Sequence, residues 1–128
     1  MARAKELKFK VQARPGMLGE VAAALGEAKV NLRGINAWIE GEEGIIRIVV
    51  DKHAIAKKLL TKRGWAPEER EVIELELADK PGALGDAATK LGKAGVNITH
   101  VFVGTGKSRT ATVFLGVSDP KVAAKVLR

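Results

Sequence analysis

The chain has 128 residues, of which 46% are apolar and 29% charged, so it suits one ordinary domain or two small ones with a real core. It contains no cysteine, which excludes disulfides, thiol catalysis and cysteine-ligated metal. No apolar run approaches the roughly 18 residues needed to cross a bilayer, and the first residues do not resemble a signal peptide. We therefore expect a cytoplasmic protein without a membrane partner.

The formal net charge of +7 raises the question of a nucleic-acid partner. The basic residues are dispersed, apart from one local cluster formed by Lys57, Lys58, Lys62 and Arg63. Charge of this kind governs solubility and non-specific association more than fold. We do not expect nucleic acid as the main partner, but a small basic RNA-binding protein remains an alternative.

The first half of the chain begins with alternating apolar and polar residues, from Leu7 to Val11. This period of two predicts a strand with one buried face. Arg14-Pro15-Gly16 then ends the strand and turns the chain. The next apolar residues recur at helical spacing, which predicts an amphipathic helix with a buried stripe of Leu18, Val21, Ala22, Leu25 and Ala28.

Two strands follow, over 31–39 and 45–50, and the residues at 41–44 predict a hairpin turn between them. Asp51 is suited to cap the start of a second helix, which Gly64 would end. That helix would direct three apolar residues toward the core, namely Ile55, Leu59 and Leu60.

The second half repeats the first. Pro15-Gly16-Met17-Leu18-Gly19 returns 66 residues later as Pro81-Gly82-Ala83-Leu84-Gly85, and ten of the eighteen positions aligned between 15–32 and 81–98 are identical. An internal repeat defines the unit of folding. The last helix should begin at Ser118 or Asp119, with Pro120 at its first position. Its inward residues would be Val122, Ala123, Val126 and Leu127.

Each half therefore has the order β-α-β-β-α with a possible fourth strand, which predicts an α+β fold of two tandem ferredoxin-like βαββαβ domains, 1–68 and 69–128. The fourth strand of the first domain would fall near 64–70, where Pro67 lacks a ladder donor. The second domain lacks a clear fourth strand. The edge of its first strand would then be unpaired, and another segment or a second chain must cover it.

The repeated segments resemble the motif of the ACT domain family. Asp79-Lys80-Pro81-Gly82-Ala83-Leu84, followed by Gly95-Val96-Asn97-Ile98, carries the resemblance. The first copy matches less fully, because it has Ala13 in place of Asp79 and Lys29 in place of Gly95. The resemblance implies a stand-alone tandem ACT protein whose modules bind amino acids or other small metabolites and regulate an enzyme.

The turns and the asparagines also have suitable chemistry for such a ligand. A helix start offers free N–H groups and a positive dipole to a carboxylate, and glycine permits close approach. An asparagine amide can donate to a carboxylate and accept from an ammonium group. The predicted ligand-binding residues are Arg14, Pro15, Gly16, Met17, Leu18, Asn31, Leu32, Asp79, Pro81, Gly82, Ala83, Leu84, Asn97 and Ile98. Plain turn chemistry is the alternative role.

Within one half, the turn and the asparagine should lie at opposite ends of the sheet. We therefore expect the turn of one half to face the asparagine of the other, so that 14–18 meets Asn97 and 79–84 meets Asn31. Asp79 offers a carboxylate to an ammonium group and Ala13 does not, which favours the Asp79–Asn31 site. Asp79 can alternatively serve to cap its own turn.

The sequence assembles no nucleophile, base and orienting group, so we expect no enzyme activity. His53 and His100 have no partner at metal-ligand spacing, and we expect neither a metal nor a cofactor. Trp38 is expected in the core or in an interface, with a ligand pocket as the alternative.

These observations predict a non-catalytic regulatory protein that binds a small amino acid or related metabolite between two ACT domains. It would form a homodimer or another homo-oligomer and would control a partner enzyme or regulator in trans. The alternatives are a permanent regulatory subunit of an amino-acid biosynthetic enzyme, the RNA-binding protein, and a scaffold for dimerisation.

Overall fold

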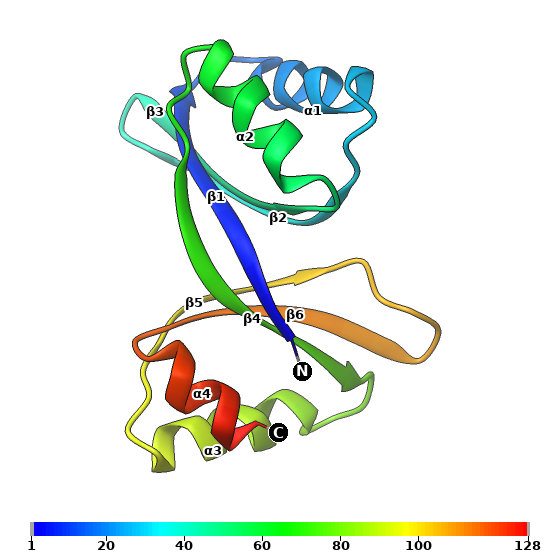
Figure 1. The fold of residues 1–128 in the computed structure, drawn as a ribbon, viewed down its shortest axis with the longest axis vertical. Helices are drawn as coiled ribbons and strands as arrows, with labels where there is room; N and C mark the ends of the chain where they lie inside the picture. Colours follow the sequence, from blue (N-terminus) through cyan, green and yellow to red (C-terminus); the bar gives the residue numbers. More distant parts are fainter. Residues whose placement is uncertain (1, 128) are drawn as a thin grey trace. The chain divides into compact units, whose positions relative to one another are not determined.

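The computed structural model describes residues 2–127 and divides them into two compact units (Figure 1). We call Lys5–Arg70 the first unit. The second unit combines residues 2–4 with the residues from Glu71 onward. The outermost residues of the two predicted domains, 1 and 128, lie outside the described part of the chain.

The first unit is an antiparallel sheet with two helices on one face (Figure 1). Its elements in chain order are β1 (Ala2–Gln12), α1 (Met17–Glu27), β2 (Leu32–Glu40), β3 (Glu43–Val50) and α2 (His53–Lys62). β3 lies between the other two strands, so that Phe9 and Ala37 are both opposite Ile46. The core between sheet and helices includes Leu7, Phe9, Val21, Leu25, Ile46 and Leu60.

The second unit repeats this arrangement. Its elements are β4 (Glu68–Ala78), α3 (Ala83–Lys93), β5 (Ile98–Gly104), β6 (Thr110–Val117) and α4 (Pro120–Val126). β6 is the middle strand, so that Leu75 and Val103 are both opposite Val113. The predicted inward residues of the last helix are confirmed, because all four belong to or pack against this core: Val122, Ala123, Val126 and Leu127.

The starts of the two short helices differ in how they are capped. α4 begins as predicted, with Pro120 in its first turn and the Val122 N–H donating to Asp119 Oδ1 at 3.1 Å. α2 begins after Lys52, and no side chain of residues 2–127 caps it. The Asp51 carboxylate accepts a hydrogen bond from the Asn31 N–H at 2.9 Å instead. The prediction that Asp51 caps α2 is therefore wrong.

The buried stripe of α1 is also displaced from the predicted one. Leu18 is 51% exposed, whereas the neighbouring Met17 is buried. Leu84, at the matching place in α3, is 43% exposed. Both leucines therefore lie at the surface beside the turns, where a ligand or a partner can reach them.

The prediction that the second domain lacks a fourth strand is wrong. The first residues of β1, Ala2–Ala4, belong to the second unit, and Arg3 Nε lies 3.0 Å from Glu71 Oε1 at its edge. Glu68–Arg70, the start of β4, belong in the same way to the first unit. Each unit thus receives the start of the long strand that continues into the other unit. The sequence hid this exchange because Ala-Arg-Ala is short, its alanines favour strands only weakly, and it lies far from the second half.

Candidate functional site

Each predicted turn joins a strand to a helix through a glycine in the left-handed conformation. Gly16 has a φ of +85° and Gly82 a φ of +88°, where a residue with a Cβ is strained. An added Cβ at either position would meet no atom of the described chain within 4 Å, so conformation, not crowding, requires glycine. Among the described residues, no side chain caps either helix. The first N–H groups of both helices therefore favour an anion.

Arg14 is held beside the start of α1. Its Nη2 donates to Glu20 Oε2 at 2.5 Å, while the Glu20 N–H donates to the Gly16 carbonyl at 3.0 Å. The Met17 N–H donates to the Arg14 carbonyl at 3.2 Å, which closes the turn. A guanidinium has five N–H donors, so the bond to Glu20 leaves others for a second carboxylate.

The second turn is closed by backbone hydrogen bonds. The Asp79 N–H donates to the Arg109 carbonyl at 3.0 Å, and the Ala83 N–H donates to the Lys80 carbonyl at 3.4 Å. Asp79, Pro81 and Gly82 are exposed, whereas Ala83 is half-buried. The roles of Asp79 as an ammonium partner or as a cap both remain predictions.

The two asparagines are fixed through their backbones. The Asn31 N–H donates to Asp51 Oδ1, and the Asn31 carbonyl accepts from the Asp51 N–H at 3.1 Å. Asn97 has the same relation to Ser118, with both bonds at 2.9 Å. Both asparagines are exposed. The sequence analysis considered Asp51 and Ser118 only at the starts of helices and missed their hydrogen bonds to the asparagines.

Within the first unit the turn and the asparagine lie at opposite ends of β3. The Ala13 N–H donates to the Glu42 carbonyl beside the start of β3, whereas Asn31 is bonded to Asp51 just beyond its other end. The expected pairing of each turn with the asparagine of the other half remains a prediction. Three other predicted site residues instead contribute to the two cores, namely Met17, Leu32 and Ile98.

The first turn adjoins a hollow of about 200 Å³ that the sequence did not reveal. Its lining includes Val11, Arg14, Leu18, Trp38, Ile39 and Ile46. Trp38 therefore lines a hollow of the first unit, as in the alternative considered for it. The sequence signal was the tryptophan itself, but the wall comes from three strands that the sequence alone does not bring together.

Trp38 is also linked to a buried ion pair. The Arg47 guanidinium lies 5.6 Å from the centre of the Trp38 ring, within the range of a cation–π contact. Arg47 Nη1 is 3.1 Å from Oε2 of Glu6, which is fully buried. The matching residues of the second unit are apolar, since Val72 replaces Glu6 and Phe114 replaces Arg47.

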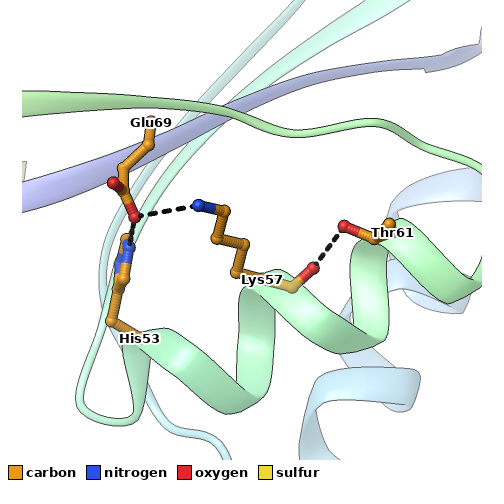
Figure 2. A network of polar contacts seen from close by, with 4 residues as sticks. All are labelled: His53, Lys57, Thr61 and Glu69. Carbon is orange, nitrogen blue, oxygen red and sulfur yellow. Dashed lines mark hydrogen bonds and ion pairs between the residues drawn. The ribbon is translucent and has the colours of Figure 1, made fainter.

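A second polar cluster joins α2 to the start of β4 (Figure 2). His53 Nε2 contacts Glu69 Oε1, and Lys57 Nζ lies 3.6 Å from the same oxygen. The hydrogen bond from His53 holds the pKa of Glu69 below its ordinary value of 4.5, and the positive charges of Lys57 and Lys5 act in the same direction. His53 thus has a partner that its sequence spacing did not suggest.

Two further findings concern the described part of the chain. Residues 2–127 contain no group of three or more His, Cys, Asp or Glu side chains that could hold a metal ion. None of the helices in this range is long and apolar enough to span a membrane.

Two helices on one face of an antiparallel sheet, repeated with the same glycine turn, define the class of tandem ferredoxin-like α+β proteins. The family model of the ACT domain matches residues 5–63 and again 72–128. The chain therefore belongs to the ACT domain family, and the resemblance seen in its motifs is confirmed.

Solved structures share this fold. A protein from Bacteroides thetaiotaomicron is 26% identical, with a TM-score of 0.89 over 98% of this chain and 86% of that one. The regulatory subunit of aspartate kinase from Thermus thermophilus, in its ligand-free form, is 16% identical, with a TM-score of 0.70 over 98% and 88%. The corresponding subunit from Thermus flavus is 14% identical, with a TM-score of 0.65 over 98% and 90%. No curated protein matches the chain.

Proposed function

We propose that this protein is a non-catalytic regulator that binds a small amino acid or related metabolite and controls a partner enzyme in trans. The observation that carries the proposal is the first turn of the first unit. There the Arg14 guanidinium, the uncapped start of α1 and an adjoining hollow lie together. A carboxylate suits the first two features, and a small side chain suits the third.

The asparagines and the second turn belong to the same proposal. An exposed amide at Asn31 or Asn97 can serve either charged end of an amino acid, and the Asp79 carboxylate can serve its ammonium group. Binding that favours one arrangement of the protein would change how a partner enzyme is held. We further propose that the protein acts as a homo-oligomer in the cytoplasm.

A permanent regulatory subunit of a biosynthetic enzyme is the second candidate. Two of the similar structures, from Thermus thermophilus and Thermus flavus, are regulatory subunits of aspartate kinase. Their likeness to this chain supports a role beside an enzyme, and the present protein would then be isolated from cells in a stable complex. Control in trans predicts contact that depends on the ligand.

A screen of the twenty amino acids by thermal shift tests the proposal. A true ligand at a hundred times its Kd stabilises the fold by about 2.7 kcal/mol, which raises Tm by several degrees. Arg14→Ala should abolish the shift, whereas Lys80→Ala, at the matching place in the second turn, is the control. Comparing Asn31→Ala with Asn97→Ala then assigns the amide that contributes.

The outcomes of this screen separate the candidates. Absence of any shift with all twenty amino acids, together with salt-dependent retention on RNA, would contradict the proposal and favour the RNA-binding alternative. A shift that survives Arg14→Ala would show that a ligand binds away from the first turn.

A further inference from the structure

The hollow beside the first turn has mostly apolar walls, with Gln12 and Arg14 as its polar lining side chains. Val11 and Ile46, which belong to the core, line it together with the large apolar side chains of Leu18, Trp38 and Ile39. Trp38 is 38% exposed, Leu18 51% and Ile39 71%. Large apolar side chains left open around a concave site are typical of a small-molecule pocket.

The only charged side chain among the described lining residues is Arg14. It stands on the turn, so a ligand whose carboxylate meets Arg14 would direct the rest of its structure along the apolar wall. Besides Arg14, the lining offers one polar side chain, Gln12, so a charged side chain would lose its water along most of the wall without gaining an ionic partner. An aliphatic or aromatic side chain would gain by leaving water.

The size of the hollow agrees with such a side chain. A hollow of about 200 Å³ has room for a branched aliphatic or small aromatic side chain, and the adjoining turn presents Arg14 and the uncapped start of α1 to a free carboxylate. We therefore argue for a free small molecule rather than a segment of a partner.

From these observations we infer that the first unit selects amino acids with apolar side chains, and that Trp38 is the residue that determines this specificity. The inference rests on the proposed function and specifies the class of its ligand. The second unit has no tryptophan at this place, because Gly104 occupies the position of Trp38 in the repeat. The apolar selection is thus a property of the first unit.

Trp38 is a natural reporter for this site. The chain has two tryptophans, and Trp65 packs against Phe9 with ring centres 6.0 Å apart. Trp65→Phe keeps an aromatic ring at that place and leaves Trp38 as the single source of tryptophan emission. Titration of this variant with leucine, isoleucine, valine and phenylalanine should change the Trp38 emission.

The same titration measures selectivity. Each added methylene in an apolar pocket is worth at least about tenfold in discrimination, so leucine should bind at least tenfold more tightly than alanine. Serine, aspartate and lysine should bind more weakly than leucine. Isothermal titration calorimetry of the unsubstituted chain supplies affinities that do not depend on fluorescence.

Substitutions at Trp38 and at Arg14 distinguish the inference from the function on which it rests. Trp38→Ala should lower the affinity for leucine at least tenfold while leaving the affinity for alanine nearly unchanged. Trp38→Leu keeps an apolar wall and should retain most of the preference for leucine over alanine. This variant replaces Trp38→Ala in the test if Trp38→Ala folds poorly. Arg14→Ala should weaken all amino acids alike.

Tighter binding of a polar amino acid, or equal leucine affinities in the Trp38→Ala and unsubstituted chains, would overturn the inference and leave the proposed function standing. Failure of every amino acid to bind would overturn both. An emission change that follows protein concentration, with no response to amino acids, would show that a second copy of the chain covers the hollow and would equally overturn the inference.

Discussion

Glu6 and Arg47 form an ion pair inside the first unit, whereas the second unit has Val72 and Phe114 at the same positions. The two halves thus fill the same place in the fold with an ion pair in one unit and an apolar pair in the other. Burying a charge is costly, and a buried pair is tolerated when each group keeps its partner. The repeat therefore supplies its own apolar reference for judging what the ion pair contributes.

Arg47→Ala is expected to lower the free energy of unfolding by about 3–5 kcal/mol, because Glu6 would remain buried without this partner. The double variant Glu6→Val, Arg47→Phe copies the second unit and should be neutral or stabilising. Urea unfolding followed by circular dichroism measures both. A double variant as unstable as the single one would contradict this interpretation.

A second exchange between the halves involves a large and a small residue. Gly34 is opposite Val49 in the first unit, but His100 is opposite Gly116 in the second. A Cβ at Gly116 would lie 2.0 Å from Cε1 of the His100 ring, so the ring occupies the space that glycine leaves. The larger residue of the pair is thus on the middle strand β3 in the first unit, but on the outer strand β5 in the second.

Gly116→Ala should therefore destabilise the protein by about 1–3 kcal/mol, as overpacking does in a tight core. Adding His100→Gly should restore most of that loss, since it recreates the small–large pair of the first unit. Thermal unfolding of the single and double variants gives the coupling between the two positions. Purely additive effects would show that the two residues do not compete for this space.

At the scale of elements, the strands and helices that depend on local signals agreed with prediction in type and place, but Ile55, expected to face the core from α2, is 48% exposed. Asp119 caps α4 because Asp-Pro at a helix start satisfies the backbone from within its own segment. Asp51 looked equally suitable, but its carboxylate bonds to Asn31, twenty residues away. A single sequence does not show which backbone N–H a carboxylate will accept from. Leu18 was misplaced because Gly16 fixes where the helix begins, and Met17 is the buried residue of its first turn.

The attachment of α2 to β4 predicts a dependence on acid. The pKa of Glu69 is lowered in the folded state, mainly by the His53 hydrogen bond and also by Lys57 and Lys5. A lowered carboxyl pKa contributes stability above the unfolded value, and that contribution is lost as pH falls through the folded one. The loss is therefore expected below the ordinary value of 4.5.

Glu69→Gln should flatten the fall in stability as the pH drops below 4.5, because the linked proton uptake is removed. Glu68→Gln, the neighbouring carboxylate on the same strand, is the matched control. Urea midpoints measured across this pH range make the comparison. Parallel curves for the Glu69→Gln and unsubstituted proteins would contradict the role given to the cluster in Figure 2.

At the scale of the whole molecule, the repeat revealed the two modules but not the exchange of strand starts. Three residues at the beginning of β1 belong with β4, and no local pattern connects segments so far apart. The candidate site likewise has one part that could be predicted from the sequence and one part that could not. The glycine turns were predictable from their motif, whereas the hollow was not, because its lining is drawn from α1 and three different strands.

Deleting residues 2–4 should weaken the second unit rather than the first. Native-state hydrogen exchange should lose protection in the part of β4 from Glu71 onward, while β3 keeps its protection. Arg3→Ala, which removes the contact with Glu71, should give a smaller effect in the same place. Loss of protection centred on β3 would contradict this assignment of the chain start.

The exchange of residues 2–4 and 68–70 between the two units also determines where this chain can be recombined with a homologue. A chimera that replaced one half by a homologous half at the midpoint of the repeat would give each module a foreign first segment. Crossovers placed after Ala4 and after Arg70 would instead transfer each module with all of its own residues. Recombination between homologues is therefore expected to give folded chains at these two points and to fail at the midpoint of the repeat.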